Sequence, residues 1–102
     1  MILKSRIEQV LFEVVDELNR MLPPGEHLAR ELHAPLAGDA GRLDSAGLIN
    51  LIALTEDAAG RALDRPVLLT DERTLAQIPV VFRTLGTLAD HIQLLLNEDR
   101  DG

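Results

Sequence analysis

Residues 41–54, with the sequence GRLDSAGLINLIAL, are the most informative segment of this 102-residue chain. Asp44 and Ser45 are both favoured at the start of a helix, because a side-chain oxygen there can accept a hydrogen bond from a free backbone amide. The apolar residues that follow continue at helical spacing to Ala58. We therefore predict a helix that begins at Asp44 or Ser45 and ends near residues 60–63. It is apolar around most of its circumference, which is typical of a helix in the centre of a core or of one with an exposed docking face.

The segment before this helix contains the clearest amphipathic pattern of the chain, over residues 5–22. Ser5 and Glu8 match the capping-box pattern at its start. Pro23-Pro24-Gly25 ends it, because proline lacks a backbone amide and disfavours helix in the residue before it. Apolar side chains recur along one face, at Ile7, Val10, Leu11, Val14, Val15, Leu18, Met21 and Leu22. This spacing predicts a helix that buries one side against the rest of the chain.

Residues 26–43 form a long connection between these two helices. Residues 26–32 favour one or two helical turns, while Pro35, Gly38 and Gly41 favour a loop over the remainder. An unanchored loop of this length is unusual in a compact domain. We therefore expect three leucines to fix it to the core, namely Leu32, Leu36 and Leu43.

The segment after residue 63 contains two further helices. Acidic residues at 71–72 predict the start of a short helix over residues 71–77, because the helix dipole favours negative charge at that end. Residues 80–82, Val-Val-Phe, are too few to assign by periodicity and are expected to pack inward as a strand-like loop. Thr84 is expected to cap the last helix, whose buried stripe comprises Leu85, Leu88, Ala89, Ile92, Leu95 and Leu96.

These elements together predict an all-α fold, a four-helix bundle with a short third helix. We expect a single domain over residues 1–97 and a polar, flexible tail at residues 98–102.

Composition narrows the class of partner. Seventeen acidic residues against ten basic ones give a net charge of -7, so nucleic acid and anionic membrane surfaces are repelled, while a basic surface on a partner protein is attracted. The absence of cysteine excludes disulfides, thiolate catalysis and thiolate zinc sites. The apolar runs are too short for a membrane helix, and the N-terminus does not have the pattern of a signal peptide. A cytoplasmic monomer is therefore expected.

Residues 41–52, GRLDSAGLINLI, resemble the phosphopantetheine attachment site of acyl carrier proteins, in which an Asp-Ser pair lies where a loop meets the second helix. The order of the predicted elements is similar too, and the run FRTLGTLADHI at residues 82–92 is similar to the fourth helix of that family. The resemblance covers nearly the whole chain. It implies the four-helix fold of carrier proteins and a protein that holds a thioester-bound acyl or aminoacyl group but catalyses no reaction itself.

The resemblance also implies a role for each residue of the attachment site. Ser45 would carry covalent 4'-phosphopantetheine, and Asp44 would orient the site and present it to a phosphopantetheinyl transferase. The start of a helix supplies free amides and the positive end of a dipole, which suit a phosphodiester. An acyl- or aminoacyl-loading ligase and downstream synthase or transferase enzymes would contact the same helix at Leu48, Ile49, Ile52 and Glu56. Ala46 stands where the family usually has leucine, which favours a stand-alone carrier of specialised biosynthesis.

Other interpretations start from the same residues. Ser45 alone is most often a helix cap worth about 1 kcal/mol, but the matching order of helices favours attachment. A hydrolase would need Gly-x-Ser-x-Gly, whereas Leu43 stands where the first glycine should be. His27, His33 and His91 lack the pair spacing of a metal site, so we expect surface histidines and no metal. The main alternative is a carrier-like interaction module, a scaffold or regulatory subunit that keeps the bundle but is never modified.

Overall fold

The computed structural model describes residues 4–37 and 43–101, except for the side chains of residues 73 and 98–101. Three long helices form most of it, namely α1 (Lys4–Asn19), α2 (Ser45–Ala62) and α5 (Leu85–Asp101). The short elements are a 3-10 helix, η1 (Pro24–Glu26), and two one-turn helices, α3 (Glu72–Leu75) and α4 (Ile78–Val81). The predicted all-α bundle is confirmed. The short helix predicted at residues 71–77 corresponds to α3, and α4 is a further one-turn helix that follows it.

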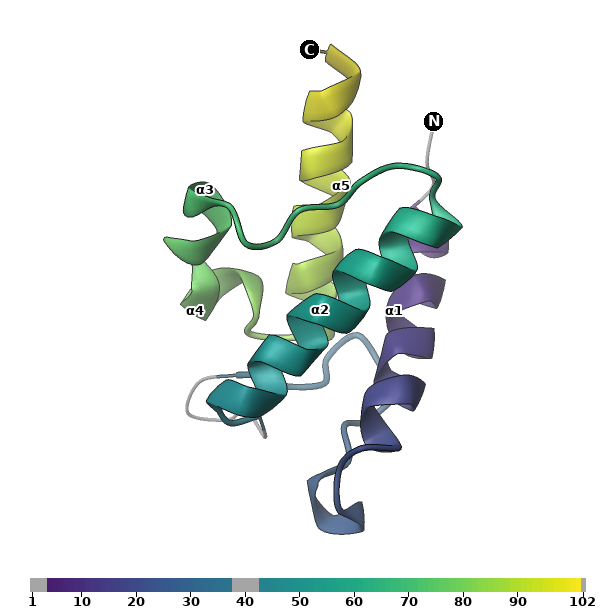
Figure 1. Cartoon of the computed structure of the whole chain (residues 1–102), viewed down its shortest axis with the longest axis vertical. Helices are drawn as coiled ribbons and strands as arrows, with labels where there is room; N and C mark the ends of the chain where they lie inside the picture. The colour runs from purple at the N-terminus through teal and green to yellow at the C-terminus, as the bar shows by residue number, and fades with distance from the viewer. Residues whose placement is uncertain (1–3, 38–42, 102) are drawn as a thin grey trace.

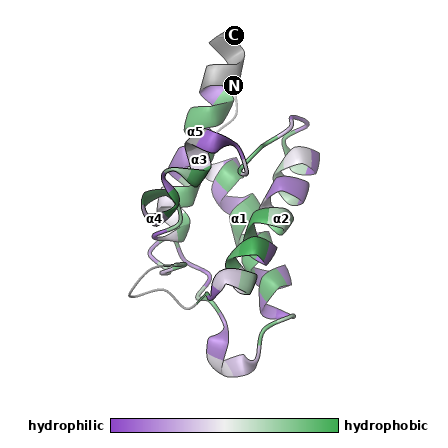
Figure 2. Ribbon diagram, turned by 60° about the vertical axis from the view of Figure 1, so that its left-hand side comes forward, coloured by the Kyte–Doolittle hydropathy of each residue, from purple (hydrophilic) through white to green (hydrophobic). Residues whose placement is uncertain are grey.

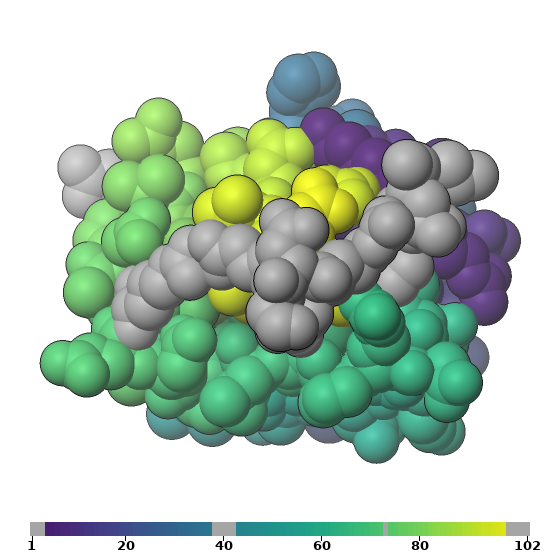
Figure 3. All heavy atoms as spheres, turned by 90° about the horizontal axis from the view of Figure 1, so that it is seen from above, coloured from purple at the N-terminus to yellow at the C-terminus, as the bar shows by residue number. Residues whose placement is uncertain are grey.

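The helix α1 packs against both α2 and α5, and α4 packs against α5 (Figure 1). An ion pair of 2.5 Å between Lys4 and Asp90 joins the start of α1 to α5, and the Asp90 carboxylate raises the pKa of the Lys4 ammonium by hydrogen bonding and by charge. Seen along the long axis, atoms of α5 lie between those of α1 and those of α3 and α4 (Figure 3). The helices α1 and α2 therefore form one layer, and α5 packs against α1 to complete the core.

The core is built mainly from aliphatic side chains of the three long helices, together with Phe82 and apolar side chains of the connecting segments. The predicted stripe of α1 is largely confirmed, because six of its residues are buried: Ile7, Val10, Leu11, Val14, Val15 and Leu18. Met21 is 54% exposed, because α1 ends at Asn19 and the chain turns away before reaching it. The capping-box prediction is wrong, since Ser5 lies within a helix that already includes Lys4. Hydrophobic residues are prominent in the middle of α2 (Figure 2). The buried residues of this helix are Gly47, Leu51, Ile52, Thr55 and Ala59, so one side of it faces the core and the other faces solvent.

The connection between α1 and α2 is fixed by backbone hydrogen bonds rather than by helix. In the first part of this connection the described helix is η1 alone, which ends at Glu26. The prediction of one or two helical turns over residues 26–32 is therefore wrong. The side-chain amide of Asn19 bonds both the carbonyl and the amide of Leu28, at 3.0 and 2.8 Å, and this clamp holds the chain where it leaves α1. Farther on, the Leu36 amide donates to the Arg83 carbonyl at 3.0 Å. Leu36 is fully buried, which confirms that it anchors the loop.

The segment between α2 and α5 differs most from the sequence prediction. Residues 80 and 81 belong to α4 rather than to a strand-like loop, because Pro79 lies in the first turn of that helix, where proline is tolerated. Val81 and Phe82 are nevertheless buried, as predicted, whereas the prediction is wrong for Val80, which is 56% exposed. Thr84 caps α5 as expected, since its hydroxyl accepts from the Thr87 amide at 3.1 Å while the Thr87 hydroxyl accepts from the Thr84 amide at 3.0 Å.

The last helix is longer than its sequence pattern predicted. It continues to Asp101, through most of the segment for which we predicted a polar tail. The physical reason is local, because no proline or glycine interrupts residues 87–101 and nothing else in that stretch forbids helical dihedral angles.

Candidate functional site

The start of α2 is where the candidate attachment serine lies, and Asp44 alone forms its cap. Asp44 has extended backbone dihedral angles, φ -82° and ψ -175°, and its side chain accepts a hydrogen bond from the Gly47 amide at 2.8 Å. This is the geometry of an N-cap, in which the side-chain oxygen satisfies one of the free amides of the first turn. Ser45 is therefore the first helical residue and not the cap, which decides between the two starts that the sequence left open.

The side chain of Ser45 is exposed and makes no hydrogen bond to any residue that the structure describes. In the first turn of a helix, the amides of the first two helical residues point out of the helix without an internal acceptor. Here these are the amides of Ser45 and Ala46, beside the positive end of the helix dipole. The hydroxyl thus combines access from solvent with an electropositive backbone environment.

Close packing beneath the site comes from Gly47, which is buried although it lies only two residues after Ser45. A Cβ atom at this position would lie 3.0 Å from Leu43 Cδ2 and 3.3 Å from Asp44 Oδ1. Leu43 packs against the core, and its amide donates to the Leu36 carbonyl at 3.0 Å. The absence of a side chain at Gly47 therefore allows the first turn of α2 to pack closely against Leu43 at the end of the loop.

The four residues predicted to meet partners have different environments. Ile49 is 65% exposed, one turn after Ser45, and is available for contact. Leu48 is half-buried and packs against the core. Ile52 is only 8% exposed and belongs to the core, so little of its side chain is left for a partner to contact, and its role in partner binding stays a prediction. Ile52 is buried because it lies on the same face of α2 as Leu51 and Ala59, which are also buried.

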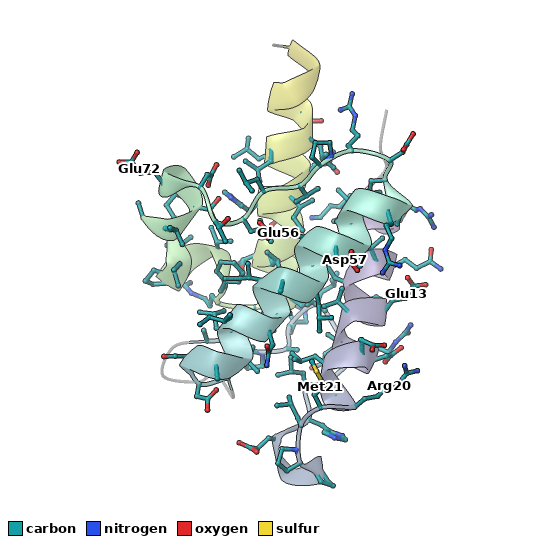
Figure 4. All side chains as sticks on the ribbon, in the orientation of Figure 1. Glu13, Arg20, Met21, Glu56, Asp57 and Glu72 are labelled. Atoms are coloured by element: carbon teal, nitrogen blue, oxygen red, sulfur yellow. The ribbon has the colours of Figure 1, made fainter. Side chains whose placement is uncertain are left out.

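Glu56 has a structural contact that the sequence did not reveal. Its carboxylate accepts a hydrogen bond of 2.7 Å from the Leu69 amide, and thereby ties the segment after α2 back onto that helix (Figure 4). A half-buried side chain held in this way presents less of its charge to a partner. A contact between Glu56 and a partner enzyme stays a prediction.

Thr55 is a buried polar residue of α2 that the sequence analysis did not single out. It is fully buried, and its hydroxyl has no hydrogen-bond partner among the residues described. The signal in the sequence was its spacing, because it lies four residues after Leu51 and four before Ala59, both of which are apolar and buried.

The histidines do not gather into a metal site. His27 is exposed, and its Nε2 lies 3.0 Å from the Leu22 carbonyl oxygen. His91 is only 7% exposed, so its prediction as a surface residue is wrong. Its Nε2 lies 2.9 Å from the Thr74 hydroxyl, which joins α5 to α3. Among the described residues, no three acidic or histidine side chains come together in a way that could hold a metal ion.

In the part of the chain that the structure describes, no helix is both long enough and apolar enough to cross a membrane.

Comparisons of the chain with protein-family models, with curated proteins and with solved structures find no match. The start of α2 is thus the observation from which a function is inferred.

Proposed function

We propose that this chain is an acyl or aminoacyl carrier protein whose Ser45 is the attachment point for 4'-phosphopantetheine. The observation that supports the proposal is the division of roles at the start of α2. The amide of Gly47, which a capping serine would have engaged, is bonded instead to Asp44. The Ser45 hydroxyl makes no hydrogen bond to a described residue, and it lies exposed where a modifying enzyme can reach it.

The residues around Ser45 fit a phosphodiester. The amides of Ser45 and Ala46 have no acceptor within the helix, and the helix dipole favours negative charge there. The carboxylate of Asp44 is directed to the Gly47 amide, which partly neutralises its charge. When bound, phosphopantetheine supplies a thiol that can hold an acyl or aminoacyl group as a thioester. The chain's own contribution is to hold Ser45 at an exposed and rigid helix start.

We also propose that the chain catalyses no reaction itself. An activated serine nucleophile needs a base within hydrogen-bonding distance. The Ser45 hydroxyl has no hydrogen bond to a histidine or carboxylate among the described residues, and both His27 and His91 contact other groups. Partner enzymes would perform the chemistry, namely a phosphopantetheinyl transferase, an acyl- or aminoacyl-loading ligase and downstream synthases or transferases, in a specialised biosynthetic pathway in the cytoplasm.

A contact surface for these enzymes begins next to Ser45. Ile49 lies one turn farther along α2 and is 65% exposed, so it offers an apolar side chain that a partner bound at Ser45 could cover. An enzyme that reaches Ser45 would also cover Ile49. We therefore propose Ile49, with the exposed part of Leu48, as the apolar contact beside the attachment point.

The test is the intact mass of the protein after incubation with coenzyme A and a promiscuous phosphopantetheinyl transferase. The chain has only two serines, Ser45 and Ser5, and both are exposed. Ser5→Ala is therefore a matched control for Ser45→Ala. We expect a gain of one phosphopantetheinyl group in the native chain and in Ser5→Ala, and no gain in Ser45→Ala. Ser45→Ala should also keep its stability within about 0.5 kcal/mol, since it removes an exposed hydroxyl that makes no hydrogen bond.

Two outcomes would contradict this proposal. Loading of Ser45→Ala would place the attachment elsewhere. No loading of the well-folded native chain by two different transferases would favour the alternative, an interaction module that keeps the bundle without modification.

A further inference from the structure

A second candidate surface lies between α1 and α2, away from Ser45. The two helices leave a groove of about 330 Å³ between them, near the lower limit of pockets that bind ligands. The lining comes from the second half of each helix, namely Glu13, Val14 and Glu17 from α1, and Leu54, Asp57, Ala58 and Arg61 from α2. Figure 4 shows Glu13 and Asp57 on the neighbouring helices. We call this hollow the α1–α2 groove.

The rim of the α1–α2 groove is acidic and only weakly neutralised. Glu13 is exposed and has no ion pair with any residue that the structure describes. Glu17 pairs with Arg20 at 2.9 Å and Asp57 pairs with Arg61 at 2.7 Å, each within its own helix. Both pairs are exposed to solvent, and pairs of this kind contribute about 0.3–0.5 kcal/mol. They can therefore be exchanged at little cost for contacts with a cation from outside.

The floor of the groove is apolar. Val14 lies at the bottom and is buried, while Leu54 and Ala58 are half-buried and lie four residues apart on one face of α2. Neither of these two is fully covered by the chain itself, so an apolar side chain placed on them would remove further apolar surface from water. A small cation would satisfy the rim but leave this floor uncovered.

We propose that the α1–α2 groove is a docking site for a segment of a partner protein that carries arginine or lysine beside an apolar side chain. The cation would meet the carboxylates of the rim and the apolar side chain would cover the floor. The charge of the whole chain, -7, favours the encounter with a basic segment. The rise of an α-helix separates Asp57 from Ser45 by about 18 Å along α2, which makes this a surface distinct from the attachment point. The proposal goes beyond the carrier function and holds whether or not Ser45 is modified.

The experiment begins with a library of displayed 12-residue peptides, selected on the whole unmodified chain. We expect the enriched peptides to contain arginine or lysine next to leucine, isoleucine or phenylalanine. The best peptide is then synthesised with a fluorescent label, and its dissociation constant is measured by fluorescence anisotropy. The groove variant Glu13→Gln/Glu17→Gln/Asp57→Asn should weaken binding by about tenfold or more, because it removes the carboxylates that contact the cation.

A matched control separates local contact from general attraction. The control variant Glu26→Gln/Glu31→Gln/Glu72→Gln makes the same change in net charge at exposed positions outside the groove. We expect it to weaken binding by no more than about threefold, because charges farther away than a Debye length are largely screened. Equal losses in the control and groove variants would overturn the proposal, as would the absence of any enriched peptide.

A second variant tests the apolar floor. Ala58→Phe places a large side chain in the groove, at a position that is only half-buried and so can accept it. We expect the selected peptide to lose binding to this variant by about tenfold or more, while the helical signal and melting temperature stay close to native. Undiminished binding to well-folded Ala58→Phe would place the peptide on another surface and overturn the proposal.

Discussion

Asp44 offers the sharpest test of how the start of α2 is built. Among the residues that the structure describes, its side chain alone accepts a hydrogen bond from the first turn, through the Gly47 amide at 2.8 Å. Asp44→Ala removes this acceptor and leaves the amide of a buried glycine without a partner. Asp44→Asn keeps an oxygen at the same place and removes only the charge. The two variants therefore separate the hydrogen bond from the interaction of the charge with the helix dipole.

The expected magnitudes follow from this geometry. Loss of an N-cap acceptor costs about 0.5–2 kcal/mol, and the burial of Gly47 places the loss in the upper half of that range, because water reaches its amide poorly. Asparagine is as good a cap as aspartate, so Asp44→Asn loses only the dipole contribution of about 0.3–1 kcal/mol. We expect Asp44→Ala to be clearly less stable than Asp44→Asn.

The assay is urea unfolding followed by circular dichroism. A loss of about 1 kcal/mol moves the midpoint by about 0.3–1 M for a chain of this size, with an unchanged slope. Asp57→Ala is the control, since it removes an exposed aspartate from the same helix and should cost no more than about 0.5 kcal/mol. Equal losses for Asp44→Ala and Asp44→Asn would refute the reasoning, because the charge and not the acceptor would then stabilise the helix.

Three further predictions concern the rest of α2. Leu51→Ala should lower the free energy of unfolding by about 2–5 kcal/mol, because Leu51 is fully buried. Ile49→Ala should change that free energy by less than about 0.5 kcal/mol, because Ile49 is exposed. Denaturant unfolding measures both, and a near-zero loss for Leu51→Ala would contradict the assigned core. Glu56→Ala should lower the free energy of unfolding by about 1 kcal/mol and speed amide hydrogen exchange at Leu69. Glu56→Gln keeps an acceptor and should lose less stability. Unchanged exchange at Leu69 in Glu56→Ala would count against the contact. Thr55→Val should leave the melting temperature unchanged or raise it, because it replaces an unpartnered buried hydroxyl with a methyl group of the same shape. A clear fall in the melting temperature would mean that the hydroxyl has a partner.

The predicted helices show how far spacing alone leads. The stripe of α1 and the cap at Thr84 depend on residues three or four positions apart, and both predictions are confirmed. The predicted strand-like loop at residues 80–82 is wrong because three residues carry no period and Pro79 suits the first turn of a helix as well as a loop.

At the candidate site, too, the sequence predicted some features and missed others. The sequence located the helix start at Asp44 or Ser45 but not which of them is the cap, because both side chains can accept the same hydrogen bond. It also grouped Ile52 with Ile49 on a docking face. A helix that is apolar around most of its circumference has no single face marked by polarity, so burial is decided by its neighbours. The structure shows Ile52 in the core and Ile49 in water.

Local sequence is enough to specify the all-α class, the helical stripes and the place where α2 begins, because each of these depends on hydrogen bonds and side-chain spacing within a few residues. Four features emerge only when the helices pack: which face of α2 is buried, the bond from the Leu69 amide to Glu56, the contact of His91 with Thr74 of α3, and the acidic groove between α1 and α2. These features join residues more than ten positions apart. Their physical cause is the packing of one helix against another, which no local pattern records.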